Sequence, residues 1–65
     1  MGISRSDIDA AHAKLQDAFQ AAVAAVRRTS GTSNWGAALD ARARAHARLK
    51  AFAARWAPVY MMLPP

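Results

Sequence analysis

Apolar residues recur along both halves of this chain at alternating steps of three and four, and a short turn-rich stretch separates the two runs. The first run consists of Ile8, His12, Leu15, Phe19, Ala22 and Val26, and the second of Trp35, Ala38, Arg42, Ala45, Leu49, Phe52, Trp56 and Val59. His12 and Arg42 are the basic residues that interrupt the two apolar runs. Such steps place side chains along one side of an α-helix, as in helices that pack side by side. The pattern therefore predicts two amphipathic helices, and no alternating β-branched run favours a strand.

Turn-forming residues occupy positions 29–34, with the sequence Thr-Ser-Gly-Thr-Ser-Asn. Gly31 can adopt a left-handed conformation that closes the first helix, and Ser33 or Asn34 can cap the second. Because this linker is short, we expect the two helices to be antiparallel neighbours. The fold class predicted is an all-α, two-helix hairpin.

The ends of the helices follow from local signals. Ser6 is a good N-cap residue, and Asp9 follows it at the spacing of a capping box. Pro58 is expected to end the second helix, since proline removes a backbone donor and restricts the residue before it. We therefore predict helices over about 6–28 and 35–57, with a hairpin domain over 1–57.

A hairpin centred near Gly31 would bring Phe19 close to Arg42 and Ile8 close to Phe52. Residues from Trp56 onward would then extend past the start of the first helix. We expect 58–65 to be an extended apolar tail that docks on a partner, because aromatic and methionine side chains are enriched at interface centres. The predicted anchors are Trp56, Tyr60, Met61, Met62 and Leu63. Folding of the tail back onto its own helices is the alternative.

Two helices cannot fully bury the apolar side chains of both runs, and a chain of 65 residues gains little from a core of this size. Docking on a larger assembly or self-association is therefore expected. The net charge is +5, and residues 31–65 carry +4 of it. Arg44, Arg48 and Arg55 share one face of the second helix, where they could contact acidic side chains or phosphate. Arg42 interrupts the apolar run itself. A solvated basic face is the alternative interpretation.

Several classes of function lack the residues they need. The chain has no cysteine, and His12 and His46 are its only histidines, which leaves zinc without enough nitrogen or sulfur ligands. The serines lie at expected caps and in the linker, and no pair of carboxylates shares a face with a cleft. We therefore expect no enzymatic activity, no metal and no cofactor. The polar amino terminus does not resemble a secretory signal, and a cytoplasmic location is expected.

The length and the alanine-rich first helix resemble small phage head–tail joining proteins, although those proteins carry a strand pair where this chain has only its linker. The resemblance implies an accessory piece of a large assembly, which would be virion-associated in that case. Our leading hypothesis is a non-enzymatic accessory subunit of a virion, a multisubunit enzyme or a ribonucleoprotein. The alternatives are a small nucleic-acid-binding protein without base specificity and, third, a peripheral membrane protein.

Overall fold

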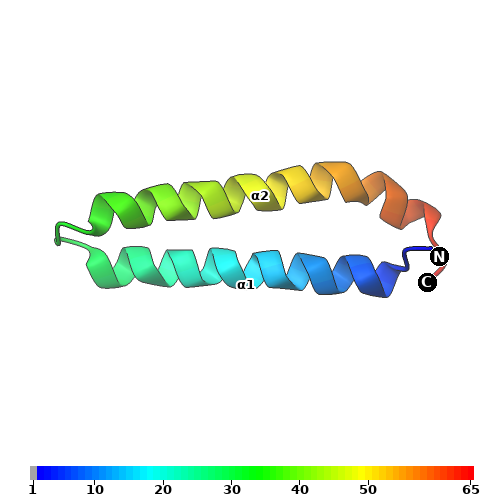
Figure 1. Cartoon of the computed structure of the whole chain (residues 1–65), viewed down its shortest axis with the longest axis horizontal. Helices are drawn as coiled ribbons and strands as arrows, with labels where there is room; N and C mark the ends of the chain where they lie inside the picture. The colour runs from blue at the N-terminus through cyan, green and yellow to red at the C-terminus, as the bar shows by residue number, and fades with distance from the viewer. Residues whose placement is uncertain (1) are drawn as a thin grey trace.

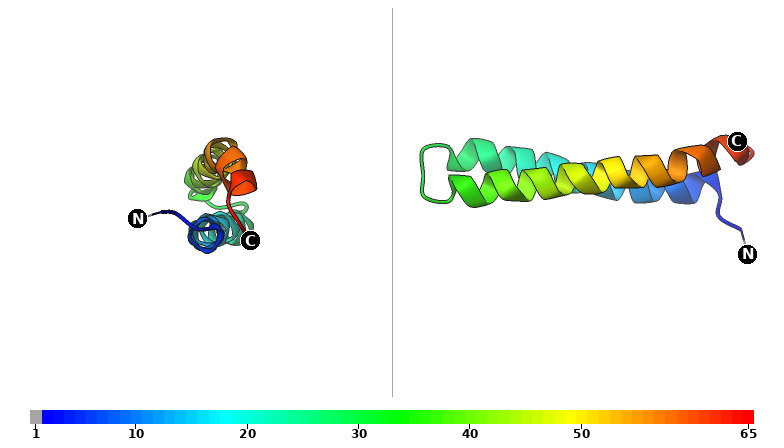
Figure 2. Two further views of the ribbon diagram at one scale, coloured as in Figure 1. Left: turned by 90° about the vertical axis from the view of Figure 1, so that its right-hand side faces the viewer. Right: turned by 90° about the horizontal axis from the view of Figure 1, so that it is seen from above.

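The computed structural model of the protein describes residues 2–65, and two helices account for nearly all of them. Helix α1 spans Arg5–Thr29 and helix α2 spans Trp35–Met62. The helices lie antiparallel, with both termini at one end and the connecting loop at the other (Figure 1). Together they form a rod of 47 × 16 × 16 Å, in which the helices cross at a shallow angle (Figure 2). The predicted all-α antiparallel hairpin is therefore confirmed.

Helix α1 begins with a capping box centred on Ser4. The Ser4 hydroxyl accepts a hydrogen bond from the Asp7 backbone N–H at 3.2 Å, and the Asp7 carboxylate accepts one from the Ser4 backbone N–H at 3.0 Å. The backbone and side-chain hydrogen bonds from Ser4 hold the pKa of the Asp7 carboxyl below its ordinary value of 3.8. The prediction of Ser6 as the N-cap was wrong by two residues, because both serines have aspartate three positions later.

The loop between the helices is tight and internally bonded. Gly31 has a φ of 80°, the left-handed conformation expected for it after the C-cap residue Ser30. The Thr32 backbone N–H donates to the Thr29 carbonyl at 2.9 Å, and the Thr32 hydroxyl donates to the same oxygen at 2.6 Å. Asn34 occupies the N-cap position of α2 but makes no side-chain capping bond.

Helix α2 continues through Pro58 as far as Met62, so the prediction of an extended tail over 58–65 was wrong for 58–62. Pro58 is exposed, and the helix turns toward the start of α1 near this position (Figure 1). A proline on the outer side of a helix bends it inward at the cost of one backbone hydrogen bond. The three-and-four repeat also continues through Val59 to Leu63, and both side chains are half-buried. Packing of this turn on α1 therefore outweighs the tendency of proline to end a helix.

The two helices pair about one helical turn away from the predicted register. The His12 ring lies against the Phe52 ring with centroids 6.0 Å apart, and the Phe19 ring lies 5.6 Å from the His46 ring. The expected pairing placed Ile8 opposite Phe52. A shift of this size brings the end of α2 alongside the start of α1, so residues after Trp56 do not overhang the hairpin.

Burial along the seam between the helices is shallow. Among residues 2–65, only Ile8 and Ala38 are buried, with 7% and 8% of their surfaces exposed. Seam residues such as Leu15, Phe19 and Leu49 are half-buried. The radius of gyration is 15.0 Å, whereas a compact domain of this length has about 11 Å. Each helix therefore covers only one side of the other, and no enclosed core forms.

Candidate protein-binding groove

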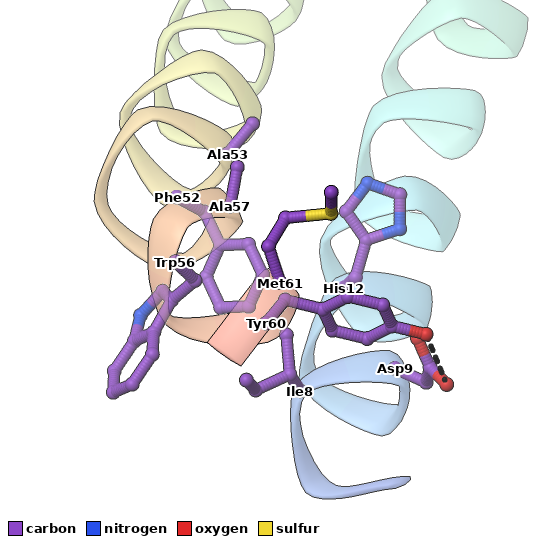
Figure 3. Close-up of a pocket in the computed structure, with 9 residues that line it drawn as sticks. All are labelled: Ile8, Asp9, His12, Phe52, Ala53, Trp56, Ala57, Tyr60 and Met61. Atoms are coloured by element: carbon purple, nitrogen blue, oxygen red, sulfur yellow. Dashed lines mark hydrogen bonds between the residues drawn. The ribbon is translucent and has the colours of Figure 1, made fainter. Parts of the chain in front are cut away.

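An open apolar groove of about 240 Å³ runs between the helices at the end of the rod that carries the termini (Figure 3). Its walls come from the first turns of α1 and the last turns of α2. The lining residues are Ile8, Asp9, His12, Phe52, Ala53, Trp56, Ala57, Tyr60 and Met61. On the α2 side the groove is lined by Ala53 and Ala57, whose small side chains leave a hollow that larger residues would fill. An apolar side chain of another protein would fit such a hollow.

Tyr60 connects the end of α2 to the start of α1. The Tyr60 hydroxyl donates to the Asp9 carboxylate at 3.4 Å (Figure 3), and the Arg5 guanidinium lies 4.9 Å from the centre of the Tyr60 ring. The Arg5 Nε donates to the Tyr60 carbonyl at 3.1 Å. This carbonyl belongs to the last turn of α2, where orphan acceptors and the helix dipole favour a cation. Arg5, Asp9 and Tyr60 form what we call the Tyr60 cluster.

The five residues predicted as docking anchors divide into two groups. Trp56, Tyr60 and Leu63 are half-buried against their own chain. Met61 and Met62 project into solvent, with 78% and 86% of their surfaces exposed. Met61 lies at the rim of the groove. Trp56, Tyr60 and Leu63 thus fold back onto their own hairpin, which was the alternative expectation. Of the five predicted anchors, Met61 and Met62 are the ones exposed enough to contact a partner.

The four predicted anion-contact residues are all exposed. The Arg55 guanidinium lies 5.3 Å from the Trp56 ring centre, a distance that allows a cation–π contact. Arg42 lines an open hollow together with Phe19, Val23, Ala43 and His46. Its long side chain therefore borders apolar surface while its charged end reaches water, as expected for an arginine within an apolar run.

Arg44, Arg48 and Arg55 lie on a different face of α2 from the groove. On α2, one side of the helix carries residues that line the groove and the hollow beside Phe19, at positions 43, 46, 53, 57 and 61. At 100° per residue, the three arginines lie on nearly the opposite side of the helix. The hairpin is therefore two-faced, with an apolar groove on one side and a basic stripe on the other.

The two histidines do not meet. His12 contacts Phe52 and His46 contacts Phe19, so more than one helical turn separates them along the rod. The expectation that they lie within about a turn of each other was wrong because of the shift in register. Over residues 2–65, no group of three or more metal-ligating side chains comes together. Within the described part of the chain, no helix contains an apolar stretch of the length that a bilayer crossing requires.

Sequence reasoning missed Arg5 and Asp9, which lie one turn apart at the start of α1. Their roles depend on the register, since each contacts Tyr60 from across the hairpin. The available signal was the continuation of the apolar repeat past Pro58, which placed the tail on the same seam as the rest of α2.

No protein-family model matches the chain, and neither curated proteins nor solved structures give a significant match. The proposals below therefore rest on the geometry and chemistry of the chain itself.

Proposed function

We propose that the protein is a non-enzymatic accessory subunit that docks onto a larger protein assembly through its groove and its exposed carboxyl-terminal side chains. The observation that carries this proposal is the failure of the hairpin to bury its own apolar seam. Its accessible surface is 4991 Å², whereas a compact protein of 7.0 kDa exposes about 4,000 Å². The difference is comparable with the roughly 800 Å² that one partner contributes to a typical stable interface.

Met61 and Met62 support this proposal because they are large apolar side chains with no role in the hairpin. Methionine adapts its shape to irregular partner surfaces and is enriched at interfaces. The rims of the groove carry the polar groups of Asp9 and His12, which suit the polar border of an interface. We place this assembly in the cytoplasm, or in a virion if the chain is of phage origin.

The test is co-purification of the tagged chain from its native source with two variants of equal charge change. Met62→Lys alters an exposed side chain on α2, and Gln20→Lys alters an exposed one on α1. We expect wild type and Gln20→Lys to retain the same partner, and Met62→Lys to lose it while its helicity stays unchanged. Retention of that partner by Met62→Lys would contradict docking through this end.

A second candidate function is binding of nucleic acid without base specificity, and the exposed arginine stripe favours it. Arg44, Arg48 and Arg55 lie on one face, where phosphates could approach without meeting the groove. Binding to any duplex should then weaken steeply as salt rises, and an Arg44→Ala/Arg48→Ala/Arg55→Ala variant should lose it. Equal binding by wild type and this variant would exclude the stripe as the contact surface.

A further inference from the structure

The side of α2 that lines the groove carries bulky apolar side chains at the opposite end of the rod. Trp35 lies in the first turn of α2 with 44% of its surface exposed, and Leu39 follows one turn later. Steps of three and four lead from Leu39 along the same side to Ala53 and Ala57, which line the hollow of the groove. One face therefore presents two bulky side chains at its loop end and a hollow at its terminal end.

We propose that a second copy of this chain covers this face in an antiparallel arrangement, so that two hairpins form a four-helix bundle. This inference rests on the proposed function and divides its surface: the second copy occupies the groove, and the exposed side chain of Met62 is left to contact the larger assembly. A twofold axis perpendicular to the rod near His46 brings Trp35 of each copy to the level of Ala57 in the other. The same axis aligns Leu39 with Ala53, so bulky side chains of one copy meet the hollow of the other at both ends.

Charges on α1 favour the same arrangement. Asp9 and Arg27 are exposed, and their separation of 18 residues corresponds to whole helical turns, so both lie on one side of α1. His46 packs beside Phe19, which places the axis near the middle of α1. Asp9 of one copy then lies within about one turn of Arg27 of the other. Within one hairpin these two residues are about 27 Å apart, too far to form an ion pair.

The area of the face matches what a stable dimer needs. The rod is 47 Å long and 16 Å wide, so one face presents about 750 Å², close to the roughly 800 Å² per partner of a standard interface. The basic stripe of Arg44, Arg48 and Arg55 stays exposed on the outside of the bundle. Met62 also stays exposed at each end, where it remains accessible to a larger assembly.

Two cations lie close to the proposed axis. Arg42 of one copy comes to the level of Lys50 of the other, and both side chains are exposed in the hairpin. Their repulsion opposes dimerisation and is screened by salt. Salt screens the attraction between Asp9 and Arg27 as well, so charge-exchange variants at constant salt test the arrangement.

The first test is sedimentation equilibrium of the full chain with charge-exchange variants. We expect a dimer for wild type, at least tenfold weaker association for Asp9→Arg and for Arg27→Asp, and recovery of association in the double variant. Recovery would have to come from contacts between copies, because the two positions do not meet within one hairpin. Met62→Ala serves as the control, since it alters an exposed side chain away from the covered face.

The second test uses disulfide formation, because the chain has no cysteine of its own. His46→Cys places a thiol beside the axis, so two copies should form a disulfide under mild oxidation. Asp17→Cys, on the outer side of α1, should react much more slowly. A monomer at all concentrations, or equal rates for the two cysteine variants, would overturn this arrangement. Failure of the proposed function would be seen in a different experiment, as retention of the assembly partner by Met62→Lys.

Discussion

Ile8 is the one large side chain that is buried within residues 2–65, and its truncation tests the packing most sharply. It lines two open hollows, each of which also has Phe52 and Trp56 in its lining. Ile8→Ala removes three carbons, worth about 2.5 kcal/mol at roughly 0.8 kcal/mol per buried carbon. Because water can reach the vacated space through these hollows, little is added for an empty cavity.

The matched control is Ile3→Ala, which makes the same chemical change at the same end of the rod. Ile3 has 46% of its surface exposed, against 7% for Ile8, so we expect a loss of about 1 kcal/mol. For a chain of this length, the Ile8→Ala variant should unfold about 10–20 °C below wild type. Thermal unfolding followed by circular dichroism measures both variants. Equal losses for the two substitutions would refute the burial of Ile8 in the seam between the helices.

Four further predictions concern the start of α1 and the end of α2. Ser4→Ala should cost about 1 kcal/mol, measured by urea unfolding, because it removes the cap of α1. The lowered pKa of Asp7 stabilises the folded state above the ordinary pKa of 3.8, and this contribution is lost as pH falls through the lowered value. The stability difference between wild type and Asp7→Asn should therefore vanish in acid, and a constant difference would contradict this. Pro58→Ala should raise the thermal midpoint, since it restores a backbone hydrogen bond at an exposed position. A lower midpoint would mean that the bend at Pro58 stabilises the hairpin by more than this hydrogen bond. Tyr60→Phe should cost under about 0.5 kcal/mol because it removes only a long hydrogen bond, and Tyr60→Ala should cost clearly more in the same urea titration.

The hairpin itself could be predicted from the sequence because its signals are periodic and repeated. The three-and-four spacing recurs through both halves, and Gly31 marks the turn with the left-handed conformation it adopts. Many residues contribute to such a pattern, so no single one has to be interpreted correctly.

The errors arose where one local signal was set against tertiary packing. Pro58 is a strong breaker, but Val59 and Leu63 gain enough contact with the seam for the helix to continue. Ser4 and Ser6 offer the same capping pattern, and the sequence alone does not choose between them. The sequence predicts Tyr60 as a docking anchor for a partner, whereas its hydrogen bonds across the hairpin are made with Arg5 and Asp9 of α1.

The candidate groove depends on the register and was therefore beyond the reach of sequence reasoning. A shift of one turn moves Phe52 from Ile8 to His12 and brings the alanines of α2 opposite the start of α1. Linker composition indicates that a turn forms but does not fix which residues face each other across it. In the same register, Tyr60 and Leu63 are half-buried at the end of α2, and Met61 and Met62 are left exposed.

The most direct test of the account is the dependence of the thermal midpoint on protein concentration. If the seam is completed by a second copy, folding is coupled to association, and a change of about 100-fold in concentration should move the midpoint by about 10 °C. A midpoint that stays constant over this range, with full helicity throughout, would show a hairpin that is stable alone and would contradict the claim that its exposed face requires a partner.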